Sequence, residues 1–253
     1  MSALPLVSLE AVRRELDGQP ALDIVRWCYE NFEPGHIALS TSFGAEGMVL
    51  LDMIMQVCQS PRVFTIDTGR MFQETYDVWQ KVIEKYNIPI EVCYPDAGDI
   101  NAMVKEQGPN LFYKSVENRK RCCYVRKVAP LRPALRDTHV WLTALRRGQS
   151  ESRSEIPVID FVPDYGLYKV CPLYQWSEET VWEYIRNNGV PFNELYNRGF
   201  RTIGCRPCSR AIGPHEDTRA GRWWWEKETA KECGIHVHGG KVQRKPKPPM
   251  YQI

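Results

Sequence analysis

Apolar residues along the chain follow two alternating patterns. Positions that repeat at helical spacing predict helices over residues 21–32, 48–57, 74–86 and 178–188. Short continuous apolar runs predict buried strands over residues 36–39, 62–66, 88–94 and 139–143. Strands that alternate with helices of this length are typical of a parallel sheet covered on both faces. We therefore predict an α/β fold built on a parallel sheet.

The remaining segments complete this outline. A short helix is predicted after the capping residue Ser8, and residues 160–171 have the pattern of a β-hairpin. The apolar periodicity fades after Arg198. We expect one main domain over residues 1–215 and a mobile C-terminal tail over residues 216–253.

Three loops are expected to meet at one edge of the sheet, because ligands bind beyond the carboxyl ends of parallel strands. They span residues 40–47, 67–70 and 146–153. The first loop is rich in hydroxyl side chains and leads into a helix, so it offers an anion backbone N–H groups and hydroxyls. It lacks the glycine patterns of Walker and dinucleotide loops, and a serine-rich helix cap without a ligand is an equally common structure.

Composition and charge narrow the classes of function. The chain has 253 residues, 43% of them hydrophobic and 25% charged, as is ordinary for a globular protein. A formal charge of +2 is too small to indicate bulk nucleic-acid binding. Residues 117–136, however, contain seven Arg or Lys and one Glu, which indicates a local anionic ligand.

The N-terminal residues and the cysteines bear on the compartment. The first residues lack a basic segment followed by an apolar run, and no apolar stretch is long enough to span a membrane. We therefore expect a cytoplasmic protein without a membrane partner. In that reducing setting the nine cysteines indicate metal or redox chemistry, since structural disulfides are rare there.

Four cysteines fall into two groups, the adjacent Cys122 and Cys123 and the pair Cys205 and Cys208. Four thiols suit a tetrahedral sulfur site for zinc or an iron–sulfur cluster. Zinc sites usually take cysteines two to four residues apart, whereas adjacent cysteines point their sulfurs in divergent directions. The adjacent pair therefore favours a larger cluster. The structural alternative is that these cysteines pack as small apolar residues.

A further cysteine, Cys233, is a candidate nucleophile near the C-terminus. Cationic neighbours such as Lys231 could lower the pKa of its thiol, and Gly234 allows another molecule to approach closely. By itself a surface cysteine near a histidine is commonly accidental. The preceding tryptophans at 223–225 are expected to anchor a segment that docks.

Together these residues resemble the iron–sulfur-cluster-containing adenosine 5′-phosphosulfate (APS) reductases of assimilatory sulfate reduction. The resemblance covers essentially the whole chain and is carried by residues 122–123, 126–127, 204–208, 219–226 and 232–236. It implies a single adenine-nucleotide α-hydrolase-like domain, similar to that of ATP pyrophosphatases, for nucleotide and cluster, with the catalytic cysteine on the tail.

The same resemblance implies roles for individual residues. Cys122, Cys123, Cys205 and Cys208 would hold a 4Fe-4S cluster, and Cys233 would be the catalytic nucleophile. The residues expected to bind the substrate are Lys127, Arg126, Arg153, Arg219, Arg222, Ser42, Gly44 and His236.

The implied reaction starts when the thiolate of Cys233 attacks the sulfur of APS, which displaces AMP and leaves a cysteine S-sulfonate. Thioredoxin or a similar dithiol donor would then release sulfite. Both electrons come from the donor, so the cluster is expected to act electrostatically and structurally. We expect no nucleic-acid partner, and a homo-oligomer is compatible with the sequence.

Three alternatives stay open at this point. The chain could reduce the 3′-phosphorylated nucleotide (PAPS), or both nucleotides, although the cluster-free PAPS reductases lack the two cysteine pairs. An ATP-pyrophosphatase-type ligase would leave Cys233 without a role, and the first loop lacks its Ser-Gly-Gly-x-Asp-Ser pattern. A zinc-stapled nucleic-acid module would be colourless and salt-sensitive in binding, whereas the reductase would be brown and contain iron and sulfide.

Overall fold

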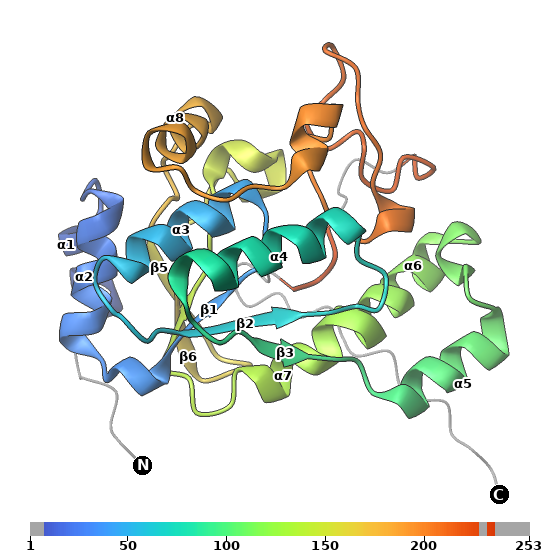
Figure 1. Cartoon of the computed structure of the whole chain (residues 1–253). Helices are drawn as coiled ribbons and strands as arrows, with labels where there is room; N and C mark the ends of the chain where they lie inside the picture. The colour runs from blue at the N-terminus through green and yellow to red at the C-terminus, as the bar shows by residue number, and fades with distance from the viewer. Residues whose placement is uncertain (1–7, 228–231, 236–253) are drawn as a thin grey trace, which may run out of the picture.

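The computed structural model describes residues 8–227 and 232–235. Within them six strands form one sheet in the order β3-β2-β1-β4-β6-β5 (Figure 1). The strands are β1 Ile37–Ser40, β2 Arg62–Ile66, β3 Glu91–Cys93, β4 Val140–Leu142, β5 Ile159–Val162 and β6 Leu167–Val170. All neighbouring pairs are parallel except β5 and β6, which are antiparallel. The predicted α/β fold and the hairpin at 160–171 are both confirmed.

Helices cover both faces of this sheet. They are α1 Leu9–Leu16, α2 Ala21–Asn31, α3 Ala45–Met55, α4 Gln73–Tyr86, α5 Ala97–Gln107, α6 Val116–Cys123, α7 Ala129–Ala134 and α8 Glu178–Asn188. Figure 1 shows α3 and α4 on one face of the sheet and α7 on the other. The sheet is therefore the buried middle layer.

The alternation along β1 explains how one strand serves two cores. Ile37 and Leu39 pack with α3 and α4, whereas Ala38 packs with Leu131 of α7 on the opposite face. Successive side chains of a strand point to opposite faces, so a run that is apolar throughout is buried on both.

Local signals end several elements where the sequence places them. The hydroxyl of Ser177 accepts a hydrogen bond from the amide of Thr180 and caps α8, and Gly189 closes that helix in the left-handed conformation. Strand β3 is shorter than predicted because Pro89 has no N–H to donate to a ladder. Helix α3 begins three residues earlier than predicted, at Ala45, since Gly44 takes the capping position.

Three helices were not predicted from the sequence: α5, α6 and α7. Helix α6 is mostly polar and basic, and α7 contains Pro133, so neither has a clear apolar period. A π-helical turn, Tyr124–Val128, joins α6 to α7 without a loop. Such turns occur often at functional sites.

The first described part of the tail, residues 216–227, packs against the rest of the domain. Trp223 in this segment is 1% exposed. The boundary expected at residue 215 and the mobility of the tail stay predictions. No described helix combines the length and the apolar character needed to cross a bilayer.

The central strand sets a first test. Leu39→Ala should lower the free energy of unfolding by about 2–5 kcal/mol, because Leu39 is fully buried and its removal leaves a cavity. Ile83→Ala, on the exposed face of α4, is the control and should stay within about 0.5 kcal/mol of the parent. Denaturant unfolding of the three proteins measures this, and equal midpoints would contradict the burial assigned to β1.

Candidate active site

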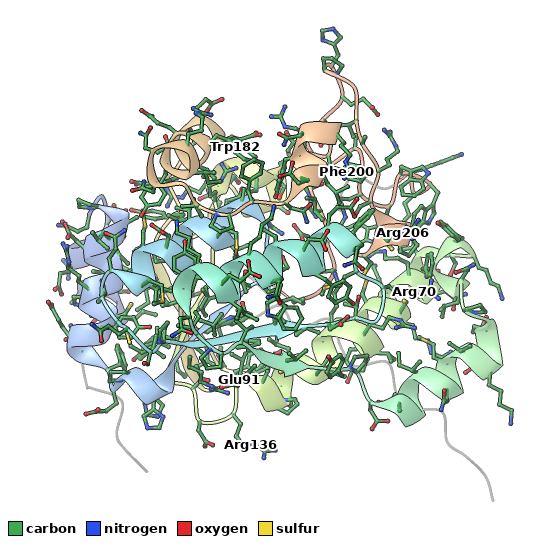
Figure 2. All side chains as sticks on the ribbon, in the orientation of Figure 1. Arg70, Glu91, Arg136, Trp182, Phe200 and Arg206 are labelled. Carbon is green, nitrogen blue, oxygen red and sulfur yellow. The ribbon has the colours of Figure 1, made fainter. Side chains whose placement is uncertain are left out.

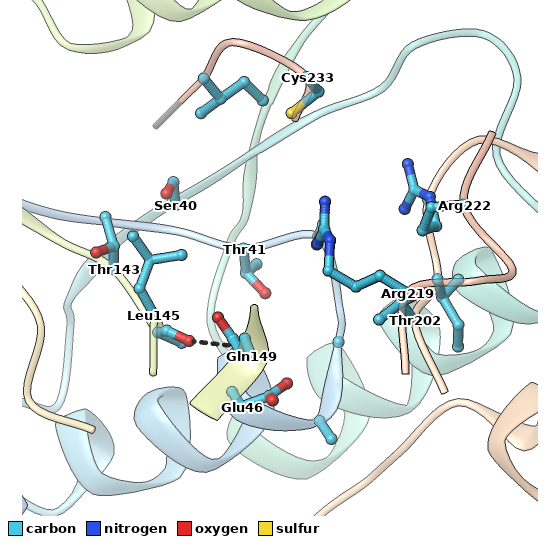
Figure 3. Close-up of a pocket in the computed structure, with 18 of the residues that line it drawn as sticks. Ser40, Thr41, Glu46, Thr143, Leu145, Gln149, Thr202, Arg219, Arg222 and Cys233 are labelled. Atoms are coloured by element: carbon cyan, nitrogen blue, oxygen red, sulfur yellow. Dashed lines mark hydrogen bonds between the residues drawn. The ribbon is translucent and has the colours of Figure 1, made fainter. Parts of the chain in front are cut away.

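A pocket opens at the carboxyl ends of β1, β2 and β4 (Figure 3). Each of the three loops predicted to meet contributes to it: Ser42 and Gly44 from the first, Thr68 from the second and Arg153 from the third. The expectation that parallel strands bring these loops together is therefore confirmed.

The first loop presents the start of α3 to this pocket. The side chain of Thr41 folds back and accepts a hydrogen bond from the amide of Phe43 at 3.0 Å. Phe43 has a φ of 59° and is fully buried, so it holds the turn while Ser42 stays exposed. The amide of Ala45 donates to the hydroxyl of Tyr196 at 3.0 Å. The loop is thus fixed in place before any ligand arrives.

Most cations that line the pocket already have a carboxylate partner. Arg146 pairs with Glu46 at 2.8 Å, and Arg201 pairs with Glu178 at 2.7 Å. Arg153 and Arg219 both face Glu232.

Two lining cations form no ion pair with a carboxylate in the described ranges, Lys127 and Arg222. The Nε atom of Arg222 is buried and has no hydrogen-bond partner there. These two side chains supply the net positive charge that an anionic ligand would meet.

Arg222 is held by its neighbours in the chain. Its guanidinium lies 4.6 Å from the ring centroid of Trp223, a cation–π contact. A side chain at position 204 would overlap that guanidinium, so Gly204 is required for the close approach. The lack of a side chain at Gly204 thereby allows Arg222 to lie next to Cys205 and Cys208.

The four grouped cysteines line a second cavity, together with Phe112, Pro207, Arg70, Arg119, Arg126 and Lys127. Cys122 and Cys123 end α6, whereas Cys205 precedes a short 3-10 turn, Arg206–Cys208, and Cys208 ends it. The amide of Arg206 donates to the carbonyl of Arg70 at 2.8 Å and joins this turn to the loop after β2 (Figure 2). The fold thus brings the two cysteine groups together, as the sequence predicts.

Lys127 and Cys205 border both cavities. Burial disfavours the charged ammonium, but the sulfurs of Cys205 and Cys233 outweigh burial and raise the pKa of Lys127. Burial likewise opposes the Cys205 thiolate, but Lys127 and the hydroxyl of Thr68, 3.3 Å from the sulfur, prevail and lower its pKa. Burial raises the pKa of Cys123 and Cys208 to about 12 in each case.

Cys233 borders the first cavity and packs, as Cys205 does, against the cluster of buried side chains that contains Cys122, Cys123 and Cys208. Figure 3 places it at the rim of the pocket that Arg219 and Arg222 also border. Gly234, the next residue, has a φ of 86°, a conformation that favours glycine. His236 lies outside the described residues.

Arg126 occupies a different place from the other predicted substrate contacts. It lines the cysteine cavity, and its Nη1 donates to the carbonyl of Thr68. It is absent from the described lining of the first pocket. Its contact with the substrate stays a prediction, as do those of the other residues named for that role.

Sequence reasoning missed a buried ion pair that fastens the tail. Arg119 donates through Nε and Nη2 to both carboxylate oxygens of Glu226, at 2.8 and 2.9 Å, and the two side chains are 1% and 2% exposed. The Nη1 atom of Arg119 also donates to the main-chain carbonyl of Glu232 at 2.7 Å. No local spacing signals a pair between residues 107 positions apart.

Comparison with known proteins places these features in a family. Residues 36–211 match the family described as phosphoadenosine phosphosulfate reductase domain. An adenosine 5′-phosphosulfate reductase of Allochromatium vinosum is 46% identical over 200 residues, which cover 79% of this chain and 78% of that protein. A protein of the same name from Burkholderia cepacia is 43% identical over 201 residues, which cover 79% and 80%.

Solved structures agree on the fold. The phosphate complex of a phosphoadenylyl-sulfate reductase from Candida auris superposes with a TM-score of 0.69 at 27% identity, covering 81% of this chain and 98% of that one. Yeast FAD synthetase gives a TM-score of 0.54 at 17% identity, covering 81% and 68%, and this likeness concerns the fold alone. The expected adenine-nucleotide α-hydrolase-like fold is confirmed.

The ion pair of the tail sets a second test. Glu226→Ala should lower the free energy of unfolding by about 3–5 kcal/mol, because it leaves the Arg119 guanidinium buried without its counter-charge. Replacing both partners by apolar residues, as in Arg119→Met with Glu226→Leu, should recover most of that loss. Glu106→Ala, which breaks the exposed pair with Arg121, is the control and should change little. A loss no larger than the control's would contradict the burial of the pair.

Proposed function

The chain belongs to the phosphoadenosine phosphosulfate reductase family and is an oxidoreductase, and on this premise we propose that it reduces APS to sulfite and AMP in sulfate assimilation. The observation that carries the proposal is the position of Cys233, which borders a pocket where Lys127 and Arg222 have no carboxylate partner among the described residues. A thiol beside such cations is placed to attack an anionic substrate.

The first step transfers the sulfonate group. The Cys233 thiolate attacks the sulfur of APS, an S–S bond forms, and the bond from sulfur to the bridging phosphate oxygen breaks. AMP leaves with the electron pair of that bond. Lys127 and Arg222 neutralise the negative charge that develops on the phosphate oxygens, since preorganised charged donors stabilise such developing charge.

The second step releases the product. A thiolate of a dithiol protein such as thioredoxin attacks the Cys233 sulfur, and sulfite leaves with the pair of the S–S bond. The second thiol of the donor then resolves the mixed disulfide and restores the Cys233 thiol. The donor is oxidised by two electrons, and sulfur in the substrate is reduced by two, so the reaction balances without another redox partner.

A 4Fe-4S cluster is part of this proposal, and the four cysteines that line the second cavity fit it. Four cysteines border one cavity, and Arg70, Arg119, Arg126 and Lys127 line it with them, which suits an anionic cluster held by thiolates. In the ranges described, no three His, Cys, Asp or Glu side chains gather as closely as a single metal ion requires. The adjacent Cys122 and Cys123 favour a larger cluster over one zinc ion, because neighbouring cysteines point their sulfurs in divergent directions. When bound, it would fix α6 and the Cys205–Cys208 turn in place and add local charge beside Lys127.

The names of the relatives support APS over PAPS as the substrate. Relatives that share 41–46% of their aligned residues with the chain are named APS reductases. The Candida auris neighbour, named for the 3′-phosphorylated nucleotide, favours the alternative. Paired turnover assays with APS and PAPS and thioredoxin as donor decide between them. A cytoplasmic location and a homo-oligomer stay predictions.

Removal of the nucleophile tests the chemistry. Cys233→Ser should lower sulfite release by about a thousandfold or more, because the other described cysteine at this pocket, Cys205, is assigned to the cluster in this proposal. Cys58→Ser, a half-buried cysteine away from both cavities, should keep the parent rate. Mass spectrometry of the parent mixed with APS alone should find the sulfonate on the Cys233 peptide. A sulfonate on another cysteine would contradict this assignment.

Metal content tests the cofactor. The anaerobically purified parent should contain iron and acid-labile sulfide, and Cys205→Ser should lose most of both, because one of four ligands is gone. Cys58→Ser should retain the parent content. Circular dichroism checks that the variants are folded. A colourless parent that contains zinc would refute the cluster.

A further inference from the structure

Glu232, the residue before the nucleophile, makes a dense set of contacts. Arg153 donates through Nε and Nη2 to its two carboxylate oxygens at 3.1 and 3.0 Å, a bidentate pair. The hydroxyl of Ser152 adds a hydrogen bond at 3.2 Å, and Nη2 of Arg219 lies 3.4 Å from the carboxylate. Bidentate arginine–carboxylate pairs are among the stronger and most directional polar contacts.

The main chain of Glu232 is held as well. Its carbonyl accepts the hydrogen bond from Nη1 of Arg119, whose other nitrogens hold Glu226. Side chain and backbone of one residue are therefore fixed by arginines from three parts of the chain, and Cys233 is the next residue. The sulfur's position is set by contacts made one residue away.

Charge supports the same assignment. Burial alone would raise the pKa of Glu232, but Arg153 and Arg219 outweigh burial and lower it, so the carboxylate is ionised near neutral pH. The remaining Nη1 of Arg153 donates to Gln149 at 2.6 Å, so every nitrogen of that guanidinium is engaged. Lys127 and Arg222 are left facing the pocket without a carboxylate partner among the described residues.

We propose that Glu232 is a positioning residue: its ion pair with Arg153 and Arg219 docks the segment that carries Cys233 at the pocket before the sulfonate is transferred. The proposal deepens the function proposed above and rests on it. In it Arg153 and Arg219 dock the segment as well as keeping their predicted substrate contacts, whereas Lys127 and Arg222 have no carboxylate partner among the described residues. Docking matters because holding two reacting groups in place removes an entropic part of the barrier.

The first experiment needs no substrate. The holoenzyme is treated with iodoacetamide without nucleotide, and alkylation of the Cys233 peptide is followed by mass spectrometry. Glu232→Gln should raise the rate at Cys233 by about tenfold or more, the ratio that corresponds to one lost charge-assisted hydrogen bond. Glu151→Gln removes an exposed carboxylate from the loop beside Arg153 and is the control, with the parent's rate. Equal rates in all three proteins would overturn the docking role.

A double-mutant cycle tests whether the pair is the cause. Arg153→Gln alone should also raise alkylation of Cys233, and the variant with Arg153→Gln and Glu232→Gln should be no faster than the faster single variant. Groups that act through one contact are non-additive in this way. Rate increases that multiply would show that the two residues act separately and would overturn the proposal.

The second experiment separates positioning from binding. In a single turnover with APS, Glu232→Gln should form the Cys233 S-sulfonate about tenfold more slowly at saturating nucleotide, while the Kd for AMP stays within about twofold of the parent. A much tighter Kd for AMP with an unchanged rate would overturn positioning, since Glu232 would then be competing with the nucleotide for the arginines. Rescue of the rate by Glu232→Asp, which keeps the charge, would support it.

The outcomes distinguish the two proposals. A parent enzyme that forms no sulfonate with APS would refute the function, and the alkylation results would still decide whether Glu232 docks the segment. A Glu232→Gln variant that is sulfonated and alkylated at the parent's rates would refute docking and leave the function standing.

Discussion

The buried pair of Arg119 and Glu226 is the contact on which the site depends. Arg119 stands on α6, the helix that ends in Cys122 and Cys123, and Glu226 stands on the tail that leads to Cys233. Burying a guanidinium is costly unless its donors are paired. Contact between α6 and the tail is therefore favoured over a state in which Arg119 is buried without Glu226. The pair places the cysteine cavity and the nucleophile in one structure.

The cations around this contact fall into two groups, those paired with carboxylates and those without a carboxylate partner among the described residues. Carboxylates neutralise the arginines that hold loops and tail, as Glu46 does for Arg146, whereas Lys127 and Arg222 line the first cavity without a carboxylate partner among the described residues. Lys127 is at the centre of that arrangement, since it borders both cavities. A substrate with several negative charges is drawn to the place where the protein has not already satisfied its own cations.

Much of this could be predicted from the sequence, and the limits have physical causes. The buried strands and the loops at their carboxyl ends follow from local pattern and from the geometry of parallel sheets, and the fold confirms both. Helix α6 was missed because its residues are mostly polar and show no apolar periodicity. Glu232 could be recognised only as part of a motif, since its partners Arg119 and Arg153 come from distant segments that the completed fold brings near.

The π-helical turn Tyr124–Val128 has a consequence for how this chain can vary. It joins two helices whose angular phases differ, with Cys123 facing the cysteine cavity at one end and Leu131 facing the sheet at the other. Each residue added to or removed from a helix rotates the rest of that helix by about 100°. A one-residue deletion there would convert the π-helical turn into a regular α-helix. It would also rotate either Cys123 away from the cysteine cavity or Leu131 away from the sheet. The length of this segment is therefore constrained more tightly than its composition.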